Sequence, residues 1–247
     1  GAGDDTISGI IQATMANVAT TVNAGDVIDG GAGNDTLKIS ATGADGNAAV
    51  SISALETKNV ETISVNNFAT GSGEHTIDGS LMTGLTSVGL NASTAAGDTT
   101  FSAIGNIVDV FMKSGNANLT VTYVATATAG AQTQNVSLSG VTNSTTNLTI
   151  AGVETVNITT SAAKSTLNNL AFDAATTLNI SGDQNLTIAG SVPATAGTID
   201  ASGLTGKLSM TATFTPAASS LTGGSNDDTI TVGSGELTAT STYDGGA

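Results

Sequence analysis

Apolar residues recur at a spacing of about 22 in the second half of the chain, and this spacing restricts the fold more than any other feature. The series starts at Val156 and continues at Leu178, Ile199 and Leu221. Repeats of this length are typical of architectures in which similar units stack along an axis. One such unit cannot bury its inward face alone, whereas stacked neighbours share a continuous core. The spacing therefore predicts the coils of a β-solenoid.

The runs around these positions have the pattern of β-strands. Apolar residues alternate with Thr, Ser or Asn, and Gly, Asn, Asp and Ser separate the runs. Residues 60–65 (VETISV) and 153–158 (VETVNI) look like two copies of one element. We expect an all-β fold, a parallel β-solenoid of the β-helix or β-roll kind, with ladders of Asn over Asn and Thr over Thr. Tandem antiparallel β-sandwich domains are the alternative, because short strands with frequent turns also fit them. The best helical candidate is the segment 10–22.

Residues 30–38 (GGAGNDTLK) fit the nonapeptide G-G-x-G-x-D-x-U-x, in which U is a large apolar residue. This pattern is a known calcium-binding repeat. Its glycines permit tight turns, and its aspartate supplies the hard oxygen ligand that calcium prefers. Partial copies occur at 1–8, 21–29, 223–231 and 244–247. The candidate calcium ligands of these segments are Asp5, Asp26, Asp29, Gly31, Gly33, Asp35, Asp227, Asp228 and Asp244.

The motif copies divide the chain into three expected parts. Residues 1–40 and 221–247 would form calcium-binding turns, and residues 41–220 would form the strand-rich body of the solenoid. In tandem repeats of this kind, successive turns share each ion. The partner of the motif at 30–38 must therefore be the turn at 21–29 or a coil that is distant in the sequence. Because the chain begins without Met and inside a motif, we expect it to be part of a longer protein.

Composition excludes several functional classes. The formal net charge is −15, with 20 acidic residues against 5 basic ones. Nucleic-acid binding needs many Lys and Arg side chains for the phosphates, so it is excluded, and an anionic membrane surface would repel the chain. There is no cysteine, which excludes disulfides and thiolate metal sites. No run of 18 apolar residues is present, so we expect no membrane insertion.

The sequence gives little support for an enzyme. The nucleophile motif G-x-S-x-G and the zinc motif H-E-x-x-H are both absent. His75, the single histidine, lies in a polar, Gly-rich stretch and is expected on the surface. Glu61 and Glu154 occupy equivalent places in the two VET runs, and paired carboxylates can hydrolyse glycosides. Aromatic and basic residues, which such sites usually carry, are scarce. A polysaccharide-degrading β-helix is therefore the less favoured hypothesis.

Several segments resemble RTX-type surface-layer proteins of Gram-negative bacteria and, more loosely, the large RTX adhesins. The segments that carry this resemblance are GGAGNDTL at 30–37, GVETVNI at 152–158, ATTLNISGD at 175–183 and TIDASGLTG at 198–206. The resemblance implies a calcium-stabilised β-solenoid that is exported by a type I secretion system. It also implies assembly into a lattice at the cell surface, with calcium driving both folding and subunit contacts.

The expected function is therefore structural. We expect a segment of a secreted, extracellular surface-layer protein that binds Ca²⁺ and associates with further copies of itself through calcium-mediated contacts. A cell-surface polysaccharide is a second candidate partner. The alternative is a calcium-stabilised adhesin or biofilm-matrix module, which would bind a partner without forming sheets.

Overall fold

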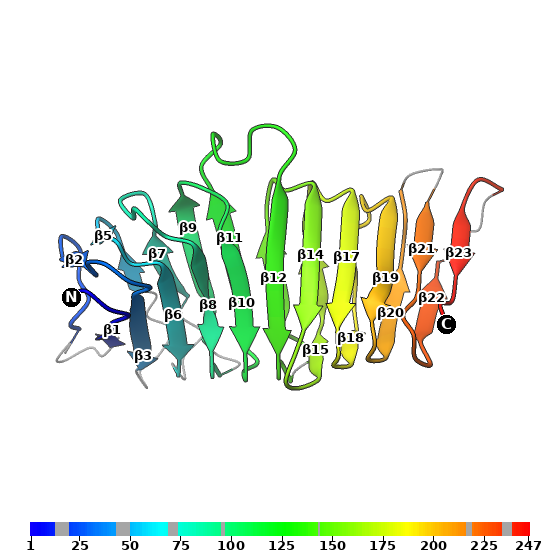
Figure 1. Ribbon diagram of the computed structural model, residues 1–247, viewed down its shortest axis with the longest axis horizontal. Helices are drawn as coiled ribbons and strands as arrows, with labels where there is room; N and C mark the ends of the chain where they lie inside the picture. The colour runs from blue at the N-terminus through cyan, green and yellow to red at the C-terminus, as the bar shows by residue number, and fades with distance from the viewer. Residues whose placement is uncertain are drawn as a thin grey trace. The chain divides into compact units, whose positions relative to one another are not determined.

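The computed structural model describes residues 1–12, 20–42, 50–68, 74–94, 97–142, 144–215, 219–233 and 239–247. All regular elements in these residues are β-strands, so the all-β prediction is confirmed. None of the described residues forms a helix that could cross a membrane. The chain divides into two compact units, Gly1–Ala127 and Thr128–Ala247, and each unit is a parallel β-solenoid (Figure 1).

The strands of the first unit form three faces, and each face pairs strands in parallel. The first face contains β1 (Thr6–Gln12), β3 (Thr36–Thr42), β6 (Thr62–Asn67), β8 (Ser87–Asn91) and β10 (Asp109–Lys113). The second contains β4 (Val50–Ile52), β7 (His75–Asp78), β9 (Thr99–Ile104) and β11 (Leu119–Tyr123). The third pairs β2 (Val27–Asp29) with β5 (Glu56–Lys58). The chain visits these faces in turn, which produces the coils.

The second unit is built in the same way. Its first face contains β12 (Thr133–Ser139), β14 (Thr155–Thr160), β17 (Thr177–Gly182), β19 (Thr198–Leu204), β21 (Ser220–Thr222) and β23 (Thr242–Asp244). Its second face pairs β13 (Asn147–Ile150) with β16 (Asn169–Ala171). Its third contains β15 (Ser165–Leu167), β18 (Leu186–Ile188), β20 (Leu208–Ala212) and β22 (Thr229–Val232).

The core consists of inward-facing residues that stack from coil to coil. Val156, Leu178, Ile199 and Leu221 are register partners in four successive strands of the second unit, as their spacing in the sequence predicts. All four are at most 3% exposed. Because neighbouring parallel strands lie about 4.8 Å apart, each side chain packs directly on its counterpart in the next coil. The parallel pairing also shows that the alternative of antiparallel sandwich domains is wrong.

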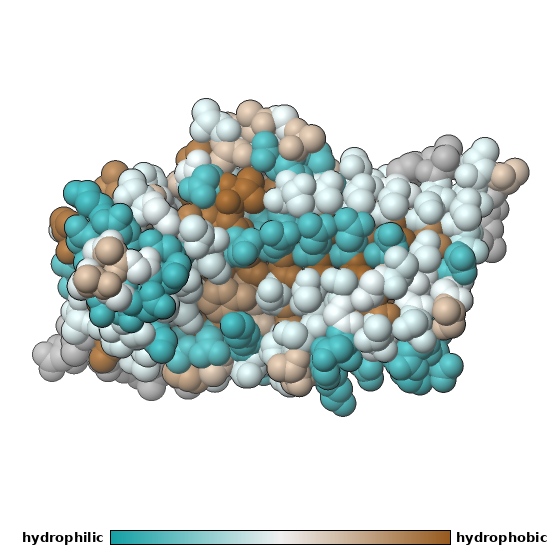
Figure 2. All heavy atoms as spheres, viewed as in Figure 1, coloured by the Kyte–Doolittle hydropathy of each residue, from teal (hydrophilic) through white to brown (hydrophobic). Residues whose placement is uncertain are grey.

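The outward face of the second unit carries the expected polar ladders. Asn135, Asn157 and Asn179 occupy one row across three strands. The side-chain amide of Asn157 donates to Asn135 Oδ1 at 3.0 Å, and that of Asn179 donates to Asn157 Oδ1 at 2.8 Å. A hydrophilic row crosses this face in Figure 2. The ladders explain how a chain rich in Asn and Thr can form a regular sheet, because the exposed amides bond one another along the stack.

One expectation about local structure is wrong, and another falls largely outside the described residues. The helical candidate at 10–22 begins inside β1, which continues through Gln12, and residues 13–19 lie outside the described residues. His75 is 2% exposed rather than on the surface. It occupies an inward position of β7, in register with Val50 and Thr99, so the alternation of the strand places it inside. A polar neighbourhood in the sequence does not reveal this, because the next coil supplies the burial.

The stacked core residues predict how much a cavity would lower the free energy of unfolding. Ile158 is 0% exposed and stacks between Val136 and Ile180. We expect Ile158→Ala to lower the free energy of unfolding by about 2–5 kcal/mol, because neighbouring coils cannot close the space. Ser137→Ala, at an exposed position of β12, is the control and should change it by less than about 0.5 kcal/mol. Urea unfolding followed by circular dichroism measures both, and equal effects would contradict the stacked core.

Candidate metal centre

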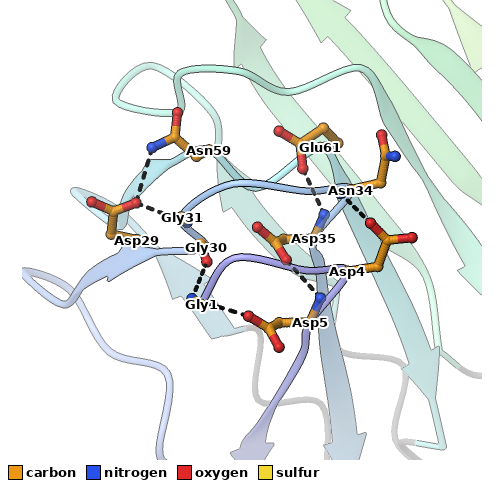
Figure 3. A network of polar contacts seen from close by, with 10 residues as sticks. All are labelled: Gly1, Asp4, Asp5, Asp29, Gly30, Gly31, Asn34, Asp35, Asn59 and Glu61. Carbon is orange, nitrogen blue, oxygen red and sulfur yellow. Dashed lines mark hydrogen bonds and ion pairs between the residues drawn. The ribbon is translucent and has the colours of Figure 1, made fainter.

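The two best copies of the glycine motif lie directly against each other. Thr6 of β1 pairs with Thr36 of β3, so the turn at 1–5 stacks on the turn at 31–35 (Figure 3). The backbone amide of Ala32 donates to Gly1 O at 3.1 Å, and that of Thr36 donates to Asp5 O at 2.9 Å. Of the two partners that the sequence allowed for the nonapeptide, the structure supplies the distant coil. We call the turns at 1–5 and 30–35 the glycine corner.

The motif glycines allow these two backbones to approach each other. Gly33 has φ of 134°, and a Cβ there would lie 2.6 Å from the carbonyl carbon and oxygen of Gly3. Gly31 has φ of 100°, and its Cβ would lie 2.3 Å from Gly1 O. Positive φ is accessible to glycine at little cost, whereas a side chain at either place would collide with backbone. The spacing of the glycines is therefore set by contact between turns.

Asp35 is the central acidic residue of the glycine corner. It is 0% exposed, and its Oδ1 accepts a hydrogen bond from the backbone amide of Asp5 at 2.7 Å. Its Oδ2 is buried and has no hydrogen-bond partner among the described residues. That oxygen points toward Gly30, where a Cβ would lie 2.4 Å from it. A buried carboxylate oxygen without a donor costs about 1–3 kcal/mol or more, so this position favours a cation.

A third turn continues the stack beside Asp35. Glu61 Oε2 accepts a hydrogen bond from the backbone amide of Asp35 at 2.6 Å. Asn59 donates its side-chain amide to Asp29 Oδ1 at 3.0 Å, and the same oxygen accepts from the Gly31 amide at 3.1 Å. Glu61 is not among the metal ligands predicted from the sequence. Its place directly before β6, matching Asp35 directly before β3, is the signal that could have identified it.

The first turn adds two more carboxylates and a positive charge. Asp4 Oδ1 accepts from the Asn34 amide at 2.8 Å. The N-terminal ammonium of Gly1 lies 3.0 Å from Asp5 Oδ2 and donates to Gly30 O at 2.9 Å. The hydrogen bond and charge of Asp5, with smaller contributions from Asp35 and Asp29, raise the pKa of this ammonium. Asp5 Oδ2 and the carbonyl oxygen of Gly30 therefore both lie next to the Gly1 nitrogen.

The turn at 21–29 does not stack on the nonapeptide. Its strand β2 pairs with β5 on the third face, whereas β3 belongs to the first face. Asp26 Oδ2 accepts from the Asn23 amide at 2.7 Å, which closes a local turn. Asp29 is the member of this segment that reaches the glycine corner, through its contact with Gly31. The possibility that the turn at 21–29 is the partner of the motif at 30–38 is therefore wrong.

The C-terminal copy has a different arrangement. Asp228 Oδ1 accepts from the Leu208 amide of the preceding coil at 2.8 Å, and its Oδ2 accepts from the Gly224 amide at 2.6 Å. Asp227 is 94% exposed at its side chain and lies 3.6 Å from Lys207 Nζ. Asp244 is exposed, and its Oδ1 accepts from Gly246 at 3.0 Å. Both oxygens of Asp228 are thus bonded to backbone amides, unlike those of Asp35.

The described residues do not gather three or more His, Cys, Asp or Glu side chains into a ready-made metal cluster. A metal at the glycine corner would therefore depend on backbone oxygens as well as carboxylates. The carboxylate ligands would be Asp35 Oδ2 and Asp5. The carbonyl ligands would be Gly1 O and Gly30 O. This set contains only oxygen, which fits Ca²⁺ better than a transition metal. Of the predicted ligands, Asp5, Gly31, Gly33 and Asp35 lie together, whereas Asp227, Asp228 and Asp244 belong to the other unit.

The stacked turns predict different outcomes for Gly33 and Gly3, which belong to the two stacked copies of the motif. Gly33→Ala should destabilise the first unit by about 1–3 kcal/mol, because it combines a strained φ with a backbone collision. Gly3→Ala is the matched control, since a Cβ there meets no atom within 4 Å. Thermal unfolding of the two variants measures the difference. A Gly33→Ala variant as stable as Gly3→Ala would contradict the close stacking of the turns.

A comparison of the chain with protein-family models found no match. Comparisons with curated proteins and with solved structures also found no similar protein.

Proposed function

We propose that this chain is a calcium-stabilised structural segment of a secreted bacterial surface protein that associates with further copies of itself. The observation that carries the calcium part is the buried Oδ2 of Asp35, which lies between two stacked copies of the glycine motif without a donor. The surface-layer part rests on the resemblance of the segments at 30–37, 152–158, 175–183 and 198–206. A role at the cell surface is consistent with the absence of cysteine and with the acidic surface.

The corner carboxylates explain why calcium would control stability. Asp4, Asp5, Asp29, Asp35 and Glu61 lie on three successive turns, and each accepts at least one hydrogen bond or ion pair from a neighbouring residue (Figure 3). Carboxylates on stacked turns repel one another when no cation is bound. A bound calcium ion would supply the positive charge, and binding only to the folded state would stabilise that state by linkage.

Hydrogen bonds to backbone amides support a structural role for Glu61 and Glu154. Glu61 Oε2 accepts from the backbone amide of Asp35, and Glu154 Oε2 accepts from that of Gln132 at 2.7 Å. In each case the acceptor belongs to one coil and the donor to the coil before it. A carboxylate held by a backbone amide contributes to the joining of coils. This favours a structural role over glycoside hydrolysis for these residues.

Calcium titration of the Asp35→Asn variant tests the proposal. At a calcium concentration 100 times the dissociation constant, the wild-type chain should gain about 2.7 kcal/mol of unfolding free energy. Asp35→Asn should lose most of this gain. In chelator the variant should be at least as stable as the wild type, because it removes a buried uncompensated charge. Thermal unfolding followed by circular dichroism, with and without calcium, measures all four values.

Asp183→Asn is the matched control, because Asp183 is an exposed aspartate at a turn of the second unit. It should keep the full calcium response. Magnesium should give a much smaller shift, since it requires a near-ideal octahedral site. A wild-type chain that unfolds at the same temperature in calcium and in chelator would overturn the calcium proposal. Electron microscopy in calcium tests the assembly part, because an adhesin module would stay dispersed whereas a surface-layer segment would form sheets.

A further inference from the structure

The outward face of the first unit has a hollow of about 260 Å³. Its lining residues lie on the strands β3, β6, β8 and β10 of the first face, which are neighbours in Figure 1. The lining residues are Thr36, Lys38, Thr62, Ser64, Ser87, Asn91, Phe111 and Lys113. We call this hollow the lysine pocket. It contains two of the five lysines of a chain whose net charge is −15.

The register of the strands explains why a hollow forms here. Lys38, Ser64, Gly89 and Phe111 occupy one row across the four strands, with the small residues in the middle. A Cβ at Gly89 would lie 2.6 Å from Phe111 Cγ, so the aromatic ring covers the space that a side chain would fill. The floor of the pocket is therefore backbone and serine, and its ends are lysine and phenylalanine.

The two lysines of the pocket are not used in ion pairs within the described residues, whereas Lys58 and Lys207 pair with Glu56 and Asp227. Lys38 and Lys113 are both exposed. Lys113 Nζ lies 5.0 Å from the centroid of the Phe111 ring, which holds the ammonium at the pocket wall. The pocket thus has two ammonium groups that can attract an anion.

We propose that the lysine pocket binds an acidic sugar, such as a hexuronate unit of an acidic polysaccharide. The Phe111 ring, which covers Gly89 and has Lys113 Nζ over it, contributes apolar surface to the pocket wall that a sugar ring can contact. The ammonium groups of Lys38 and Lys113 pair with the carboxylate. Thr36, Thr62, Ser64, Ser87 and Asn91 supply hydroxyl and amide groups that bond the sugar hydroxyls.

Other ligand classes fit this pocket less well. A neutral sugar would leave both lysines without a function in binding. A phosphate group can pair with the lysines, but it has no apolar face that could contact Phe111. Asp109, exposed at the end of the neighbouring row with Ser87, also repels an anion, so the lysines must offset its charge.

The inference goes beyond the proposed structural role and does not depend on calcium at the glycine corner. Its test therefore uses the whole chain in chelator, with the fold verified by circular dichroism. Isotope-labelled protein is titrated with trigalacturonate, and backbone amide shifts in β3, β6, β8 and β10 are followed by NMR. Parallel titrations use the neutral trisaccharide galactotriose and inorganic phosphate.

We expect trigalacturonate to bind and to shift amides on these four strands, with galactotriose at least about tenfold weaker. The double variant Lys38→Met and Lys113→Met should weaken trigalacturonate by about tenfold or more, because it removes both charges and keeps most of each apolar stem. Phe111→Leu should also weaken it, by about fivefold. Lys164→Met, at an exposed lysine of the second unit, is the control and should bind as the wild type does.

Three results would overturn the inference. Equal binding of galactotriose and trigalacturonate would remove the role of charge. Phosphate that binds as tightly as trigalacturonate would identify a general anion site. A double lysine variant with unchanged affinity would place the ligand elsewhere. None of these outcomes bears on the calcium response of the Asp35→Asn variant, so failure of one proposal leaves the other to be judged separately.

Discussion

The structure depends on the stacking of successive coils in register through parallel backbone pairing. Each coil alone exposes its apolar residues, and burial occurs only when Val156, Leu178 and Ile199 lie one above another. The same register sets the polar rows outside, where Asn157 bonds Asn135 and Asn179. A slip of one residue would exchange the inward and outward rows, so the apolar columns fix the register of each unit.

Several carboxylates accept hydrogen bonds from backbone amides of the neighbouring coil. Asp35 and Glu61 do so at the glycine corner, and Glu154 and Asp228 do so in the second unit. A charge-assisted bond of this kind is stronger than a neutral one, and it satisfies an amide at a place where the strand pairing begins. Asp35 differs from Asp228 in that one of its oxygens is buried without a donor. This difference is why the glycine corner, rather than the C-terminal motif, is the better candidate for a cation.

The two proposals use different surfaces of the first unit. The glycine corner gathers acidic groups at a turn, whereas the lysine pocket gathers basic and aromatic groups on a sheet face. Both result from register, since neither set of residues is contiguous in the sequence. Lys38 and Phe111, for example, meet in one row because three successive strand pairings align them. A solenoid can thus carry chemically distinct sites on neighbouring surfaces, because each outward row is free to vary while the inward columns stay apolar.

The sequence alone determined the all-β class and predicted the stacked apolar columns of the second unit and the polar ladders, because these follow from a period that is visible in the chain. It favoured a solenoid over antiparallel sandwich domains, and the parallel pairing of the strands decided between them. It also located Asp35 and its glycines. Only the tertiary structure decided which segments stack, because coils of unequal length bring Thr6 to Thr36 while the nearer segment at 21–29 pairs on another face. For the same reason the burial of His75 and the lysine pocket were not predictable, and the contact of Glu61 with Asp35 was not predicted. A local pattern shows which way a side chain points, but the residue that it meets belongs to another coil.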